Sequence, residues 1–142
     1  MLRVIKPIHS STQVVHVETD AGEAFLKGPG PQQGSEALAF DLVGTRLARL
    51  CGLFTPDFAV IDNDRLEIRR FDGELVTPGP AFVSRALPGN TGGHEAFLSR
   101  LMNSHDVPLL VAFDTWIANT DHIHQLAIIM INQIGITYSL CA

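Results

Sequence analysis

The fold is decided first by a stretch near the N-terminus, QVVHVETDAGEAFLK, which runs from Gln13 to Lys27. Apolar and polar residues alternate along its first half, as they do in a strand with one buried face. Turn residues at 20–23 then lead into a second apolar run, Ala24 to Lys27. The stretch therefore predicts a β-hairpin, and a short strand at 3–7 is expected before it.

The clearest helix of the chain is expected next, from Ser35 to Cys51. Its leucines recur at near-helical spacing, Ser35 can cap its first turn, and Gly52 offers a C-terminal stop. On this apolar helix face, a buried and unreactive Cys51 thiol is expected.

The other elements follow from the same kinds of pattern. Strands are expected at 57–61, 66–69, 81–85, 126–131 and 134–140, and helices at 94–102 and 107–118. The apolar side of the last helix is expected to hold Leu109, Leu110, Phe113, Trp116 and Ile117. Because 88–93 is rich in glycine, a boundary is expected there between residues 1–88 and 89–142. The fold class is α+β, a sheet with one main helix followed by the start of a helical part.

Composition narrows the class of protein. The chain has 142 residues, 46% of them hydrophobic, which is enough for one hydrophobic core. Its formal net charge of −5 argues against an extended basic surface. A nucleic-acid partner is therefore not expected, since phosphate neutralisation needs clustered basic residues. Two cysteines, no signal-peptide pattern and no apolar run long enough for a bilayer favour a cytoplasmic protein without a membrane partner.

Lys27 is the first residue that could carry chemistry. It ends an apolar strand and is followed by a glycine-rich break, where a lysine can act as a point charge on a phosphate. A solvated lysine at a strand end is an equally good interpretation. If the lysine is functional, an acid on the next helix should hold it, and Asp41 and Glu36 are the candidates. Asp41 lies among apolar helix neighbours, whereas Glu36 suits the first helical turn.

The most informative stretch runs from Phe113 to Asp121, Phe-Asp-Thr-Trp-Ile-Ala-Asn-Thr-Asp. It resembles the entry to the catalytic loop of the HipA-like kinases. Upstream segments are similar to other motifs of that family, in the right order, over residues 4–126. These segments are Phe25-Leu26-Lys27, Phe40-Asp41-Leu42-Val43, Leu47 to Leu53, Thr55-Pro56 and Ala81-Phe82-Val83-Ser84.

The resemblance implies a protein-kinase-like fold that binds ATP between two lobes. Lys27 would contact the phosphates, and Asp41 would take the place of the family's glutamate. The hinge beside the adenine would be formed by Ser84, Arg85, Ala86 and Leu87. Asp121 would be the catalytic base that orients the acceptor, a serine or threonine hydroxyl of a protein.

The sequence differs from the family pattern at the positions that bind the metal ion. The position of the family's metal-binding asparagine is Leu126, and no Asp or Glu occurs after Asp121. Mg²⁺ prefers oxygen ligands, so no metal ligand is assigned and Mg²⁺ binding is doubtful. The resemblance thus implies a truncated or degenerate member that binds nucleotide but does not complete phosphotransfer.

Two other functions stay open. His122 and His124, together with Asp121, could bind zinc in a zinc-dependent hydrolase site. Beyond the two histidines, no third strong zinc ligand lies nearby in the sequence. The chain could also be a pseudokinase-type interaction module. In that case its last helix would expose Leu109, Leu110, Phe113 and Trp116 to a protein partner or to a second copy of the chain.

Overall fold

A computed structural model describes residues 2–9, 14–29, 34–64, 67–87, 90–91, 104–118, 130–132 and 135–137. The chain divides into two compact units. The first contains residues 1–43, 57–86 and 141–142, and the second contains 44–56 and 87–140. The predicted boundary between 88 and 89 stays a prediction, because both residues lie outside those described.

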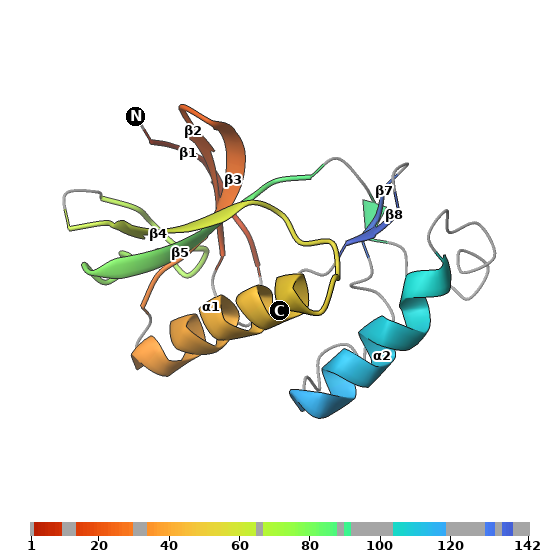
Figure 1. Ribbon diagram of the computed structural model, residues 1–142. Helices are drawn as coiled ribbons and strands as arrows, with labels where there is room; N and C mark the ends of the chain where they lie inside the picture. Colours follow the sequence, from red (N-terminus) through yellow and green to blue (C-terminus); the bar gives the residue numbers. More distant parts are fainter. Residues whose placement is uncertain are drawn as a thin grey trace. The chain divides into compact units, whose positions relative to one another are not determined.

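The first unit is built on a five-stranded antiparallel sheet with the order β1-β2-β3-β5-β4 (Figure 1). Its strands are β1 Arg3–Pro7, β2 Val15–Thr19, β3 Gly22–Lys27, β4 Phe58–Asp62 and β5 Pro80–Arg85. The predicted hairpin is confirmed, since β2 pairs with β3 from Val15 opposite Leu26 to Thr19 opposite Gly22. Gly22 closes the turn with a φ of 109°, a backbone angle that favours glycine.

One face of this sheet carries the core of the first unit. Alternation along β2, β3 and β5 places Val15, Val17, Ala24, Leu26, Ala81 and Val83 together, and all are buried. Ile68 and Val76, from the segment between β4 and β5, complete the cluster.

The predicted strand at 66–69 is wrong within the residues described. Arg69 makes only an isolated bridge to Leu75, and residues 67 and 68 are irregular. The segment turns back on itself instead: the Val76 N–H donates to the Ile68 carbonyl and the Arg70 N–H donates to that of Glu74. Local bonds thus satisfy backbone groups that a pairing with β4 would have used.

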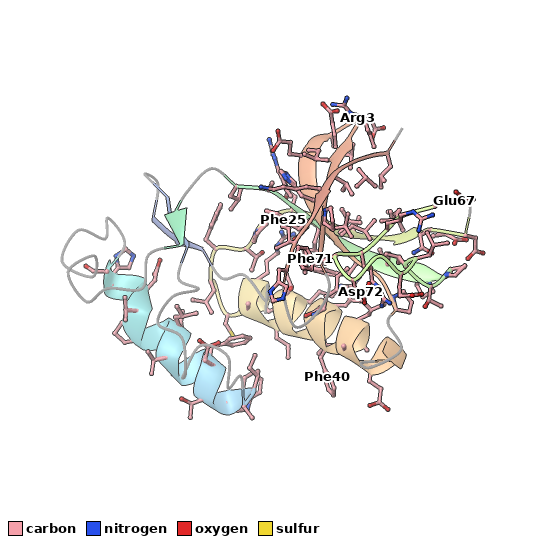
Figure 2. The ribbon with its side chains drawn as sticks, turned by 180° about the vertical axis from the view of Figure 1, so that it is seen from behind. Arg3, Phe25, Phe40, Glu67, Phe71 and Asp72 are labelled. Atoms are coloured by element: carbon pink, nitrogen blue, oxygen red, sulfur yellow. The ribbon has the colours of Figure 1, made fainter. Side chains whose placement is uncertain are left out.

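Helix α1, Gly34–Leu50, confirms the predicted helix within one residue at each end. Its end is a Schellman motif: the Leu53 N–H donates to the Ala48 carbonyl, and the Gly52 N–H donates to that of Arg49. The expectation of a buried Cys51 is wrong, because Cys51 lies exposed in this terminal turn. Phe40 is 73% exposed and points away from the sheet (Figure 2).

The second unit contains α2, Val107–Trp116, after a short 3₁₀ turn at Ser104–Asp106. A three-stranded sheet of β6 Asn90–Thr91, β7 Met130–Asn132 and β8 Gly135–Thr137 also belongs to it. These last two strands overlap the ranges predicted at 126–131 and 134–140. The predicted helix at 94–102 lies outside the described residues.

Only part of the predicted apolar side of α2 is packed. Leu110 and Phe113 are each 3% exposed and form a cluster with Ala48 and Leu53. The expectation that Leu110 and Phe113 are available to a partner is therefore wrong. Leu109 and Trp116 do face solvent, with 40% and 68% of their surface exposed.

Candidate functional site

Lys27 and Asp41 form a buried ion pair in the first unit. Lys27 is the last residue of β3, and Asp41 lies two turns into α1; their Nζ and Oδ2 atoms are 2.7 Å apart. Their side chains are only 10% and 8% exposed. Glu36, the other candidate acid, is exposed. The predicted approach of Lys27 to Asp41 is thus confirmed.

Burial dominates the electrostatics of this pair. Loss of solvent raises the pKa of Asp41 above its ordinary value of 3.8, and the Lys27 charge lowers that pKa by a smaller amount. The Lys27 ammonium is close enough to Asp41 Oδ2 for a charge-assisted hydrogen bond, and this bond also lowers the pKa of Asp41. Ionised Asp41 is therefore held in a place that disfavours its charge.

Aromatic side chains line the sheet face that carries Lys27. Strand alternation places Phe25 on the same face as Lys27, and the register sets Phe82 directly opposite Lys27. Phe58 stacks on Phe82 with ring centroids 5.6 Å apart. Sequence reasoning did not assign Phe58 or Phe82 to the site; their pattern of alternation was visible, but not the register that brings them to Lys27.

Ser84 belongs to this same face. It lies in β5, opposite Phe25 on one side and Phe58 on the other, and is 9% exposed. His16 is the next residue across the sheet: its ring lies 5.1 Å from that of Phe25, and its Nε2 is 3.0 Å from Glu23 Oε2. Ser84 therefore lies between Phe25 and Phe58 on this face, and His16 flanks Phe25 on its other side.

The other residues predicted for the hinge are placed differently. The Arg85 N–H donates to the Asp57 carbonyl and the Ala86 N–H donates to the Glu23 carbonyl, both at 2.8 Å. These two donors are thus engaged within the first unit. Alternation also turns the Arg85 side chain to the face opposite Lys27. Leu87, the fourth predicted hinge residue, is half-buried and belongs to the second unit.

The predicted catalytic base, Asp121, lies outside the described residues, as do His122, His124 and Leu126. Asp114, from the motif that precedes them, is buried in α2. Among the residues that the structure describes, no group of three His, Cys, Asp or Glu side chains could hold a metal ion. The zinc hypothesis therefore stays a prediction from sequence.

The fold and the site together define an α+β protein whose antiparallel sheet carries a buried lysine–carboxylate pair beside aromatic side chains. Comparison of the chain with protein-family models, with curated proteins and with solved structures finds no match. Over the described ranges, no helix is both long enough and apolar enough to cross a bilayer. The functional argument therefore rests on the residues themselves.

Proposed function

We propose that this chain binds a nucleotide, ATP, at the Lys27 face of its sheet, as a kinase-like protein that does not complete phosphotransfer. The observation that carries the proposal is the buried ion pair of Lys27 with Asp41. The second step, from ATP binding to the absence of transfer, rests on the sequence after Asp121.

Stabilisation of the fold alone does not explain a buried ion pair at this position. Removing two charges from water costs several kcal/mol per ion, roughly, and well-packed apolar residues in the same place are often as stable or more so. A lysine on the third strand, held by an acid of the following helix, is also how protein kinases position a charge for phosphates. Lys27 on β3 and Asp41 on α1 have this arrangement.

The aromatic side chains beside Lys27 supply the second half of a nucleotide site. Phe25 and Phe58 are only half-buried, so an aromatic base can reach them. Stacking of a base on an aromatic ring contributes about 1–3 kcal/mol in nucleic-acid sites. With the phosphates at Lys27, the base would lie toward Phe25 and Ser84 along the same sheet face.

The residues of this chain do not fit the metal that phosphotransfer needs. Phosphoryl transfer depends on positioning and on charge neutralisation, much of which comes from Mg²⁺. The expected ligand position is Leu126, and residues 122–142 contain no Asp or Glu. Lys27 can hold phosphates in the ground state, but the charge that develops during transfer would be left without a metal.

Calorimetric titration of the full chain with ATP tests the proposal. The chain has two lysines, so Lys6→Met is a matched control for Lys27→Met. We expect Lys27→Met to weaken ATP binding about 10- to 100-fold, the value of one charge-assisted contact, and Lys6→Met to leave it unchanged. Equal affinity of wild type and Lys27→Met would overturn the proposal.

An interaction module is the second candidate, and exposed apolar side chains of α2 favour it. Leu109, Val111 and Trp116 are 40%, 58% and 68% exposed, and large apolar groups of this kind often mark contact surfaces. On this hypothesis, association persists without nucleotide and in the Lys27→Met variant. Sedimentation of both proteins with and without ATP separates the two functions.

A further inference from the structure

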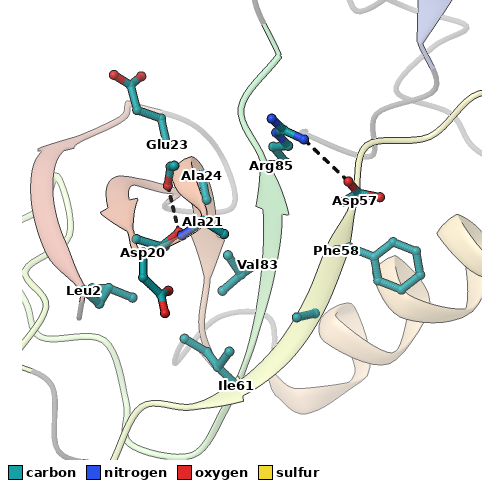
Figure 3. A pocket seen from close by; sticks show the side chains of 13 residues that line it. Leu2, Asp20, Ala21, Glu23, Ala24, Asp57, Phe58, Ile61, Val83 and Arg85 are labelled. Atoms are coloured by element: carbon teal, nitrogen blue, oxygen red, sulfur yellow. Dashed lines mark hydrogen bonds and ion pairs between the residues drawn. The ribbon is translucent and has the colours of Figure 1, made fainter.

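A pocket of about 430 Å³ lies on the other face of the five-stranded sheet, between the β2–β3 turn and the adjoining parts of β4 and β5 (Figure 3). Ala24 and Val83 belong to its lining. Both alternate with residues of the Lys27 face, Phe25 and Ser84, so the pocket is separate from the proposed nucleotide site.

The size and lining of the pocket suit a small organic ligand. Pockets for such ligands usually measure about 300–1,000 Å³ and are mostly apolar, with a few polar groups that fix orientation. Here the apolar side chains come from Leu2, Ala24, Ala59, Ile61 and Val83. Leu2 and Ile61 are only half-buried against the core, so a ligand would remove more of their surface from water.

The charges around the pocket favour a cation. Arg85 lies 3.7 Å from Asp57, and Glu23 lies 3.0 Å from His16 and points away from the pocket (Figure 3). Asp20 points in among Leu2, Ile61 and Val83, and it has no ion pair with any described residue. A positive group on a ligand would therefore find the Asp20 carboxylate next to an apolar wall.

We propose that this pocket binds a small apolar molecule with one ammonium group. Its apolar body would cover Leu2, Ile61 and Val83, and its ammonium would lie beside Asp20. The proposal does not depend on nucleotide binding, because the two sites use opposite faces of the sheet.

Three probes with the same apolar body test it: hexylammonium, hexanol and hexanoate. Each is titrated into the full chain and followed by calorimetry and by the amide NMR signals of residues 19–24 and 57–61. We expect hexylammonium to bind most tightly and hexanoate most weakly. Asp20→Asn should weaken hexylammonium about two- to fivefold, the value of an exposed ion pair, and leave hexanol unchanged. Glu67→Gln, an exposed acid outside the pocket, is the matched control.

A second variant tests the location rather than the charge. Ala59 is exposed in β4, so Ala59→Trp should fill the pocket from its rim without entering the core, and strands accept tryptophan. We expect it to abolish binding of all three probes. Equal affinities for the probes, equal losses in Asp20→Asn and Glu67→Gln, or full binding by folded Ala59→Trp would overturn the proposal. If Ala59→Trp does not fold, the comparison of Asp20→Asn with Glu67→Gln decides.

Discussion

At the scale of single residues, Lys27 and Asp41 lead to the sharpest prediction. Removing one member of a buried pair leaves the other charge uncompensated, so Lys27→Met and Asp41→Leu should each lower the free energy of unfolding by about 3–5 kcal/mol. The double variant Lys27→Met/Asp41→Leu should recover most of that loss, because two apolar side chains can fill the same space. Urea unfolding of the four proteins measures the cycle. Additive losses in the double variant would show that the two side chains are not coupled.

The same pair gives a pH prediction. Because burial raises the pKa of Asp41, the folded state holds this proton more tightly than the unfolded state, whose pKa is near 3.8. The contribution of Asp41 to stability is therefore fully present below pH 3.8 and is lost as pH rises through the raised pKa. Carboxyl-carbon NMR should find the pKa of Asp41 above 3.8 in the wild type. It should be higher still in Lys27→Met, where the attraction of the lysine is gone. A pKa below 3.8 in the wild type would contradict burial as the dominant cause.

Gly28, directly after Lys27, is predicted to be destabilised by any side chain. A Cβ at this position would collide with the Cγ1 of Val76, a buried residue of the sheet core. We expect Gly28→Ala to cost about 1–3 kcal/mol of unfolding free energy, as overpacking generally does. In a Val76→Ala background, where the colliding methyl is absent, the same substitution should cost much less. The same cost in both backgrounds, measured by urea unfolding, would place the cause elsewhere.

At the scale of elements, sequence patterns correctly predicted the helices and strands whose formation depends on neighbouring residues. Alternation and turn residues located β2 and β3, and a capped apolar repeat with Gly52 located α1. The prediction of a strand at 66–69 was wrong because the conformation of this segment depends on hydrogen-bond partners that lie elsewhere in the chain. Asn63, 1% exposed, donates to the Thr77 carbonyl and accepts from the Gly79 N–H. These bonds connect the two ends of the segment between β4 and β5. An asparagine at position 63 does not by itself predict them from the sequence.

Helix α2 shows a second limit of periodicity. It is apolar around most of its circumference, so spacing alone could not say which side chains pack. The structure selects Leu110 and Phe113 for the core cluster of the second unit and leaves Leu109 and Trp116 to solvent. The sequence thus located the helix but not its buried face.

That selection is testable. Phe113→Ala should lower the free energy of unfolding by about 3–5 kcal/mol, since it empties a buried aromatic site. Trp116→Ala should change stability by well under that amount, because most of the indole already contacts water. If Trp116 contributes to association, its replacement should also shift sedimentation toward the monomer. Thermal and urea unfolding of both variants make the comparison, and equal destabilisation would refute the observed orientation of α2.

At the scale of the whole molecule, the candidate site combines predictable and unpredictable parts. The meeting of Lys27 and Asp41 could be predicted, because a strand and the helix that follows it were both recognisable. The aromatic side chains of Phe58 and Phe82 could not be assigned, because they reach Lys27 through the register of β3 with β5 and β4. Register between distant segments is decided by packing of the whole sheet rather than by any local pattern.

The 142-residue chain is predicted to bind ATP without transferring its phosphate. On the proposed function, Lys27 would supply one fixed positive charge, whereas Leu126 would stand at the metal-ligand position and residues 122–142 contain no Asp or Glu. ATP affinity should therefore be nearly the same with Mg²⁺ and with a chelator, and Asp121→Asn should leave it unchanged, since Asp121 would orient a hydroxyl rather than hold the nucleotide. Radiolabelled ATP with purified chain, with and without Mg²⁺ or Mn²⁺, should label nothing. Autophosphorylation that disappears in Asp121→Asn would contradict this prediction, because it would require a metal site that the proposal does not assign to this chain.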